Sequence, residues 1–293
     1  MKRLSFLIIG PTTQNTSDLT YEIGKRGHTS LVLPLKEVCF EFSKNVFTVK
    51  GRGKNLKNFD IVFFRGYNEN FIEAQILAKK FLDEKKIVID EAIGRGFIPG
   101  KIFEAGQFIK NKLLHPQTFQ ALNFSSYCKI LKNIPFPIIV KPVRGQKGKD
   151  MYKFDSQQEA LNFFKKNPIG YLIQEYLPID GDIRVFVVGN KVIGAIKRFV
   201  IKGDFRSNAS LGAKAEEYTV DENLKKLSLS AAKIMRYEIA GVDVIRHKGK
   251  YFILEVNFAP QWQKFKEITG INPAKHIIDY AIQKYEKNKA RLL

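Results

Sequence analysis

The chain has 293 residues, of which 44% are hydrophobic and 27% charged, the usual composition of a soluble globular protein. No apolar run approaches the roughly 20 residues that a membrane-spanning helix needs, which excludes a helical membrane protein. The formal net charge of +20 favours acidic partners such as nucleotides, phosphates or acidic peptides, although a basic composition can equally reflect the source genome.

The cysteines and the amino terminus indicate a cytoplasmic location. Cys39 and Cys128 form no CxxC motif, which argues against a disulfide framework or a zinc site and fits a reducing compartment. The start MKRLSFLIIG has the basic and apolar character of a signal peptide, but its apolar stretch is short and lacks a small-residue cleavage pattern. A first buried strand is therefore expected there. The lysines are dispersed, so nucleic-acid binding is not expected.

The first third of the chain alternates strand-like and helical patterns. Apolar runs that predict buried strands cover residues 4–10, 30–35, 60–66 and 86–90. Helices are expected from about Thr16 or Ser17 to Lys25 and over 69–84. The apolar side of the second helix is expected to consist of Phe71, Ile72, Ile76, Leu77 and Phe81. Such alternation predicts an open α/β domain over residues 1–98, and the absence of GxGxxG argues against a dinucleotide fold.

The middle of the chain contains a strand followed by a basic, glycine-containing loop. Residues 136–143 (FPIIVKPV) predict a strand, and residues 144–150 (RGQKGKD) follow it directly. Gly145 and Gly148 let a backbone bend close to a ligand, and the basic side chains could meet phosphate. An ordinary basic turn is the alternative.

Strands and helices continue through the second half. Ser156 is expected to cap a helix to Lys166, a strand covers 171–177, and Gly189-Asn190 signals a hairpin. A helix over 221–237 and a final helix over about 273–287, with proline in its first turn, complete the pattern.

The stretch 241–257 (GVDVIRHKGKYFILEVN) predicts a hairpin that carries three oxygen donors in apolar strands. Glu255 and Asn257 are two residues apart and share a face, and Asp243 lies on the partner strand. Two carboxylates and a carboxamide on adjacent strands suit Mg²⁺ that carries substrate phosphates. A solvated face remains the alternative from spacing alone.

Several of these motifs occur in the order of a known superfamily. They are IIVKP (138–142), IQEYL (173–177), GDIRVFVVGNKVIGAIKR (181–198), GDFRSN (203–208), AGVDVIR (240–246) and LEVN (254–257). The sequence resembles the RimK-like carboxylate–amine ligases of the ATP-grasp superfamily, well over residues 101–260 and loosely before them. The resemblance implies an α/β (α+β) protein: an amino-terminal domain over 1–98, then an ATP-grasp fold over 99–293. Two α+β subdomains would clamp the nucleotide, with the lid at about 130–178.

The resemblance also implies roles for individual residues. Lys141 and Lys101 look like the family's nucleotide lysines, and the loop 144–150 would be the lid over the phosphates. The hinge that holds adenine would consist of Gln174, Glu175, Tyr176 and Leu177. The remaining nucleotide contacts would come from Asp182 on the ribose side and Asn208 near the phosphates.

The charged residues of the later motifs would carry the chemistry. Lys141, Arg198 and Arg206 are the candidate catalytic residues, and Arg184 is placed to face the same site. The metal ligands would be Asp243, Glu255 and Asn257, holding Mg²⁺ or, in its place, Mn²⁺.

The chain departs from the family pattern after Asn257. A small, glycine-rich segment is usual there, but this chain has FAPQWQKFKEITG (258–270), and we expect Trp262 to contact the acceptor. The implied function is ATP-dependent amide or peptide bond formation through an acyl phosphate, adding glutamate or another amino acid to an acidic peptide, a protein or a carrier. A small-molecule acceptor and a non-catalytic nucleotide- or nucleic-acid-binding protein are the alternatives, and the oligomeric state, including a homo-oligomer, is left open.

Overall fold

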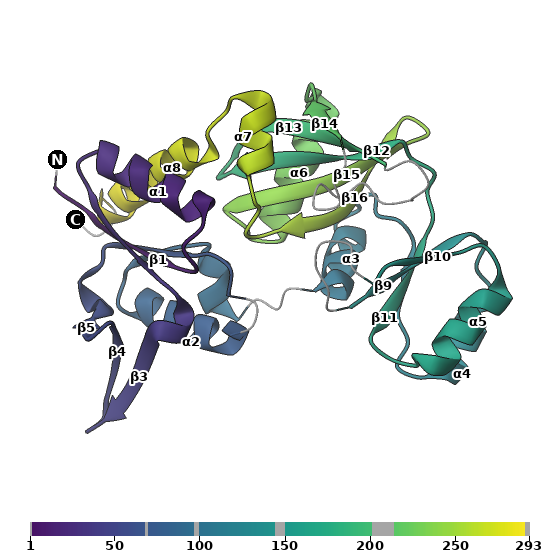
Figure 1. The fold of residues 1–293 in the computed structure, drawn as a ribbon, viewed down its shortest axis with the longest axis horizontal. Helices are drawn as coiled ribbons and strands as arrows, with labels where there is room; N and C mark the ends of the chain where they lie inside the picture. Colours follow the sequence, from purple (N-terminus) through teal and green to yellow (C-terminus); the bar gives the residue numbers. More distant parts are fainter. Residues whose placement is uncertain (1, 68–69, 97–99, 144–149, 201–213, 291–293) are drawn as a thin grey trace.

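The computed structural model describes residues 2–67, 70–96, 100–143, 150–200 and 214–290. Within these ranges the chain has an amino-terminal α/β part, a central antiparallel sheet and a smaller antiparallel sheet at the far end (Figure 1). The mixed α/β class predicted from the sequence is therefore confirmed.

The amino-terminal sheet is parallel and covered on both faces. Its strands, in the order β2-β1-β6-β7, are Thr29–Leu33 (β2), Ser5–Ile9 (β1), Ile61–Phe64 (β6) and Ile87–Ile89 (β7). One face packs against α1 (Gln14–Lys25) and α8 (Pro273–Ala290), and the other packs against α2 (Phe71–Asp83) (Figure 1). Burial on both faces explains why these strands read as continuous apolar runs.

A small antiparallel sheet projects from the amino-terminal part (Figure 1). Its strands are Val38–Ser43 (β3), Val46–Gly51 (β4) and Lys54–Asn55 (β5). Short 3₁₀ helices cover Leu35–Glu37, Leu56–Asn58 and Glu91–Arg95.

Two details of the predicted amino-terminal helices are wrong. The first helix starts at Gln14, because Thr13 rather than Thr16 or Ser17 is its cap; Thr16 closes a capping box instead. In α2, Ile72 and Ile76 are exposed, since the buried stripe has the spacing i, i+3, i+4, i+7. The stripe consists of Ala74, Leu77, Ala78 and Phe81, and its two alanines are a weak signal in the sequence.

The sheet at the far end carries the first set of predicted nucleotide residues. It runs in the order β10-β9-β11-β8, with Tyr152–Phe154 (β10), Ile138–Pro142 (β9), Tyr171–Glu175 (β11) and Thr118–Phe119 (β8). The helices α4 (Phe124–Leu131) and α5 (Gln157–Lys166), the latter capped by Ser156 as predicted, cover one face through Ile138, Val140 and Ile173. Since neighbouring residues on a strand point to opposite faces, Lys141 and Gln174 lie on the other face.

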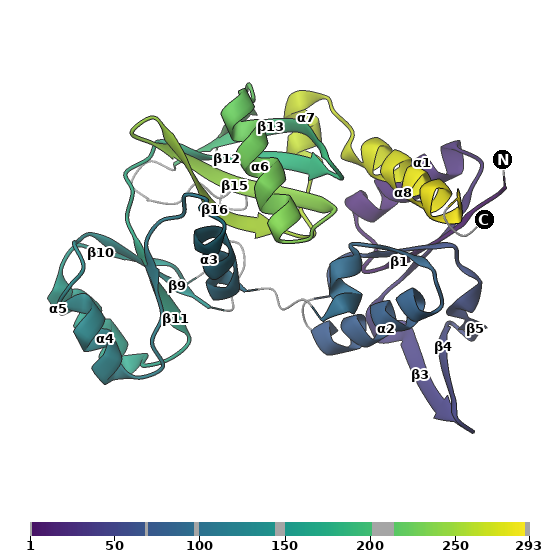
Figure 2. The ribbon, with the colours of Figure 1, turned by 180° about the vertical axis from the view of Figure 1, so that it is seen from behind.

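The central sheet carries the second set. Its order is β14-β13-β12-β15-β16, with Ala215–Glu217 (β14), Lys191–Phe199 (β13), Gly181–Val188 (β12), Ile239–His247 (β15) and Lys250–Asn257 (β16). The hairpins predicted at Gly189-Asn190 and within 241–257 are both present, and Gly189 has a φ of 57°, which favours glycine. The helix α6 (Glu222–Ile234) packs on one face (Figure 2), and the polar residues of the motifs lie on the opposite face.

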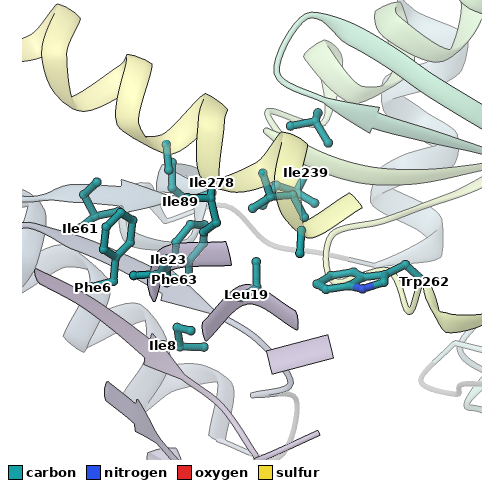
Figure 3. Packing of buried hydrophobic residues seen from close by; sticks show 14 of the residues in the cluster. Phe6, Ile8, Leu19, Ile23, Ile61, Phe63, Ile89, Ile239, Trp262 and Ile278 are labelled. Carbon is teal, nitrogen blue, oxygen red and sulfur yellow. The ribbon is translucent and has the colours of Figure 1, made fainter. Parts of the chain in front are cut away.

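The segment after Asn257 joins the central sheet to the amino-terminal part. Trp262, just before α7 (Gln263–Thr269), is fully buried in the core that also holds Leu19 of α1 and Phe186 of β12 (Figure 3). Its indole Nε1 donates to Asp18 at 3.0 Å, and the guanidinium of Arg65 lies 5.0 Å from its ring. The expectation that Trp262 contacts an acceptor is therefore wrong, because no part of its side chain is exposed.

The described part of the chain contains no helix that combines the length and apolar character needed to span a bilayer.

Trp262→Ala is expected to lower the free energy of unfolding by about 3–5 kcal/mol, because it leaves a cavity where the two parts of the chain meet. Urea denaturation followed by far-UV circular dichroism measures the change. The control is Ile72→Ala, whose side chain is 67% exposed and whose replacement should change stability by no more than about 0.5 kcal/mol. Equal stability of the two variants would contradict a core role for Trp262.

Candidate active site

The hairpin of β15 and β16 brings the three predicted oxygen donors together. Asp243 pairs directly with Glu255 in the strand register, and Gly241 pairs with Asn257. The Asn257 Nδ2 lies 3.1 Å from Glu255 Oε1 and 3.4 Å from Asp243 Oδ2. The carboxamide thus bridges the two carboxylates on the sheet face opposite α6.

Asp243 also belongs to a buried cluster of ion pairs. Arg184 donates to both of its carboxylate oxygens, at 2.7 and 2.6 Å, and Arg198 Nη2 lies 3.1 Å from Oδ2. Arg198 also holds Asp182 with two donors. Burial by itself would raise the pKa of Asp243, but Arg184 and Arg198 outweigh it and hold this pKa below its usual range.

The surroundings of Asp182 and Arg198 differ from those expected of residues that contact a nucleotide. Both are almost fully buried. A ribose contact by Asp182, or a phosphate contact by Arg198, would have to be made beside their mutual ion pair. Burial lowers the pKa of Arg198, and the charges of Asp243 and Asp182 more than reverse this, so its pKa lies above the usual value.

The donor set fits a magnesium ion through Glu255 and Asn257. Mg²⁺ is usually held by one or two carboxylates together with substrate phosphates, so a full cage of protein ligands is not required. Within the described ranges no group of three His, Cys, Asp or Glu side chains is arranged to hold a metal. Asp243 is turned toward its arginines, and its role as a third ligand stays a prediction.

Lys141 faces this cluster from the other sheet. Its Nζ donates to Gln174 Oε1 at 2.5 Å. Burial lowers the pKa of Lys141 to about 8, although the negative charge of Glu255 acts to raise it. Lys141 is partly buried beside carboxylates, and among the described residues its hydrogen-bond partner is the neutral amide of Gln174, so it is suited to receive an anion.

Helix α3 (Lys101–Lys110) contributes a residue that the sequence did not suggest. Glu104 lies one turn after Lys101 and is 8% exposed, and its Oε2 accepts the Val256 N–H at 3.3 Å. Burial, together with the charge of Glu255, raises the pKa of Glu104 to about 8. The charge of Lys101 acts on both Glu104 and Lys141, so the predicted lysine lies in the same electrostatic environment. The only available signal was the spacing of Lys101 and Glu104 on one helix face.

The other predicted nucleotide residues divide into two groups. Gln174 is buried, the Glu175 N–H donates to Gln117 O at 2.8 Å, and Tyr176 and Leu177 follow the end of β11. Arg206, Asn208 and residues 144–149 of the predicted lid loop lie outside the described residues.

The arrangement as a whole places cations and hard oxygen donors in one partly buried region. Lys141 and Lys101 supply positive charge, and Glu255 and Asn257 supply oxygen atoms for a cation. Such a combination suits a polyphosphate with its magnesium ion, since both signs of charge on the ligand meet complementary groups.

Comparisons with known proteins agree with this chemistry. The family described as the RimK-like ATP-grasp domain matches residues 105–281, more than half of the chain. A protein of Legionella pneumophila (strain Corby), named "Probable alpha-L-glutamate ligase", is 37% identical over 153 residues. This match covers 50% of the chain and 51% of that protein, so the chain spans about half the length of the first relatives it matches. A protein of the same name from Methanococcoides burtonii is 28% identical over 263 residues, 87% of each chain.

Solved structures share the fold. The ATP-grasp ligase PsnB, solved with a minimal precursor, Mg and ADP, has a TM-score of 0.74 at 17% identity and covers 96% of this chain and 98% of its own. The macrocyclase MdnC of Microcystis aeruginosa, bound to the precursor peptide MdnA, has a TM-score of 0.71 at 13% identity and covers 96% and 100%. The ATP-grasp fold expected from the sequence is therefore confirmed.

Glu104→Gln is expected to flatten the dependence of stability on pH. The pKa of Glu104 is about 8 in the folded chain against an ordinary 4.5, so between these values the folded state retains a proton that the unfolded state has lost. The free energy of unfolding therefore falls as pH rises through this window, by at most about 1.4 kcal/mol per pH unit.

The variant should lack this contribution and be more stable than the wild type at pH 8, because a glutamine oxygen still accepts the Val256 N–H. Urea denaturation at pH 5, 6, 7 and 8 measures the slope, with the exposed Glu286→Gln as the control. Parallel pH curves for Glu104→Gln and the wild type would show that Glu104 is already ionised in the folded chain.

Proposed function

Because the chain belongs to the RimK-like ATP-grasp family, we propose that it is an ATP-dependent carboxylate–amine ligase that adds glutamate to a peptide or protein acceptor. The observation that carries the proposal is the partly buried Lys141, on which the charge of Glu255 acts from the neighbouring sheet, where Glu255 is hydrogen-bonded to Asn257. A lysine opposite a carboxylate–carboxamide pair would hold the phosphates of a nucleotide between them.

The chemistry would proceed in two steps. First, a carboxylate oxygen of the acceptor attacks the γ-phosphorus of ATP, the bond to the β-phosphate oxygen breaks, and ADP leaves behind an acyl phosphate. The amino group of glutamate then attacks the acyl carbon and loses a proton, and inorganic phosphate departs as the amide bond forms. Both steps depend on positioning and charge stabilisation, so no nucleophilic side chain is required.

The residues on the two sheets would have different roles in binding ATP and Mg²⁺. Lys141, with Lys101 nearby, would neutralise charge on the phosphates of ATP. Glu255 and Asn257, with Asp243 as a third candidate, would hold Mg²⁺, which supplies further neutralisation of the phosphate charge when bound. Arg198, and Arg206 in the part of the chain outside the described residues, are the proposed contacts to the acyl phosphate or the acceptor carboxylate.

The choice of glutamate and of a peptide acceptor rests on the relatives and on charge. Curated relatives carry the name of an alpha-L-glutamate ligase, and structures of the same fold were solved with precursor peptides. The net charge of +20 would attract both acidic glutamate and an acidic peptide.

The primary test measures ADP release from ATP and Mg²⁺ with glutamate and a set of acidic peptides, followed by mass spectrometry of the peptides. An added mass of one or more glutamate residues is expected. ADP release that depends instead on a small carboxylic acid would redirect the proposal to a metabolite acceptor, and nucleic-acid binding without turnover would refute a ligase.

Lys141→Ala is expected to lower kcat/KM for ATP by about a hundredfold or more, because the phosphates lose a partly buried cation. Steady-state ADP release at varied ATP concentration measures this. Lys165→Ala is the matched control: Lys165 is exposed on α5, which covers the opposite face of the same sheet, and its replacement should leave kcat/KM unchanged. Equal effects of the two substitutions would remove Lys141 from the site.

Glu255→Ala is expected to lower turnover by about two orders of magnitude and to raise the Mg²⁺ concentration needed for half-maximal rate. Varying Mg²⁺ at saturating ATP separates this effect from weaker nucleotide binding. Glu216→Ala, an exposed glutamate on β14 of the same sheet, should retain the wild-type magnesium dependence. An unchanged magnesium requirement in Glu255→Ala would exclude Glu255 as a ligand.

A further inference from the structure

The connection between α3 and β8 runs along the edge strand β16 and makes two hydrogen bonds with the backbone of Ile253. The Ile253 N–H donates to Leu114 O at 2.8 Å, and the Ile253 carbonyl lies 2.7 Å from Nδ1 of His115. His115 is 9% exposed and stacks obliquely beside Phe108 of α3. A histidine is therefore built into the junction between the central sheet and the sheet that carries Lys141.

The partners of His115 determine its tautomer. A carbonyl oxygen can only accept, so Nδ1 carries the hydrogen and donates it to Ile253. Burial lowers the pKa of His115 to about 4, so the ring is neutral near pH 7. Its Nε2 is then an acceptor, and it faces Thr118 Oγ1 at 3.2 Å and Gln174 Nε2 at 3.4 Å.

This tautomer fixes the orientation of the Gln174 amide. The Thr118 hydroxyl donates to Pro116 O at 2.9 Å, so it too accepts from Gln174 Nε2, at 3.0 Å. With two acceptors on one side, Gln174 must turn its NH₂ group toward them. Its Oε1 consequently faces Lys141 Nζ.

We propose that His115 is a positioning residue for nucleotide binding, acting through Gln174 to hold the Lys141 ammonium in place. A reversed amide would direct its NH₂ group at the ammonium and leave two acceptors on the other side facing an oxygen. The partly buried Lys141 ammonium would then lose the Gln174 oxygen as its hydrogen-bond acceptor, which is unfavourable. The identity of the ligand as ATP rests on the proposed function.

A purely structural role for His115, sealing the edge of β16, makes a different prediction. The two functions of the ring reside on different nitrogens, and two substitutions separate them. In His115→Asn the amide ends at the level of Nδ1, so it can donate to Ile253 but cannot reach Gln174. In His115→Gln the amide extends to the level of Nε2 and can restore an acceptor there.

The experiment measures the dissociation constant of ATP with Mg²⁺ by isothermal titration calorimetry, which requires no acceptor substrate. His115→Asn should weaken ATP binding about tenfold, and His115→Gln should bind within about threefold of the wild type. Far-UV circular dichroism and urea denaturation establish that both variants are folded. The reverse order of affinities, or equal affinities of all three proteins, would overturn the positioning role.

A double-mutant cycle tests the route through Gln174. Gln174→Met removes the amide and should itself weaken ATP binding, and His115→Asn should then cause no further loss. Additive losses would show that His115 acts independently of Gln174 and would overturn the inference. If His115→Asn does not fold, Thr118→Val replaces it in the same cycle, because it removes the other acceptor of the Gln174 amide.

The wild-type titration separates the two proposals. A wild-type protein that binds no ATP would overturn the proposed function and this inference with it. A wild-type protein that binds ATP while His115→Asn binds it equally well would overturn the inference alone.

Discussion

Three buried charges and one partly buried arginine on one face of the central sheet set the conditions for the rest of the site. Asp182, Arg198, Asp243 and Arg184 alternate in sign, and their ion pairs link β12, β13 and β15. Unpaired charges at such depth would be strongly unfavourable, so each member of the cluster depends on its neighbours. The charges of Glu255, Asp182 and Asp243 on this sheet all raise the pKa of Lys141 on the neighbouring sheet.

Binding of a nucleotide at this site would exchange hydrogen-bond and ion-pair partners within the protein for contacts to the nucleotide. Lys141 would pass from Gln174 to a phosphate, and if Arg198 turned to a phosphate, Arg184 would still pair with Asp243. Such an exchange keeps Asp243 paired, and breaking a buried pair without replacement is strongly destabilising. The Gln174 amide, held by His115 and Thr118, provides the neutral contact from which Lys141 would depart.

The sequence predicted the parts of the site that depend on local pattern. The hairpin of Asp243 and Glu255 follows from two apolar strands around a tight turn, and the strand of Lys141 follows from an apolar run bounded by prolines, whereas the role of Lys141 came from the family resemblance. Glu104 and His115 could not be found in this way, since each acts through a backbone contact more than 130 residues away along the chain, with Val256 and Ile253. Trp262 was misinterpreted for the same reason: its partner Asp18 is separated from it by 244 residues, and an aromatic residue in a divergent segment resembles a binding residue until that contact is known.

The packing of α8 against the amino-terminal sheet has a consequence for folding during synthesis. Residues 273–290 and α1 cover the same face of that sheet, so its core is formed by the two ends of the described chain (Figure 1). During synthesis the strands emerge long before this helix, and for that interval Phe6, Ile61 and Phe63 lack part of their cover. Contacts of such large separation form late and slow folding, and the exposed apolar face is prone to association in the meantime. The core beside β1 is thus completed only when α8 has been made.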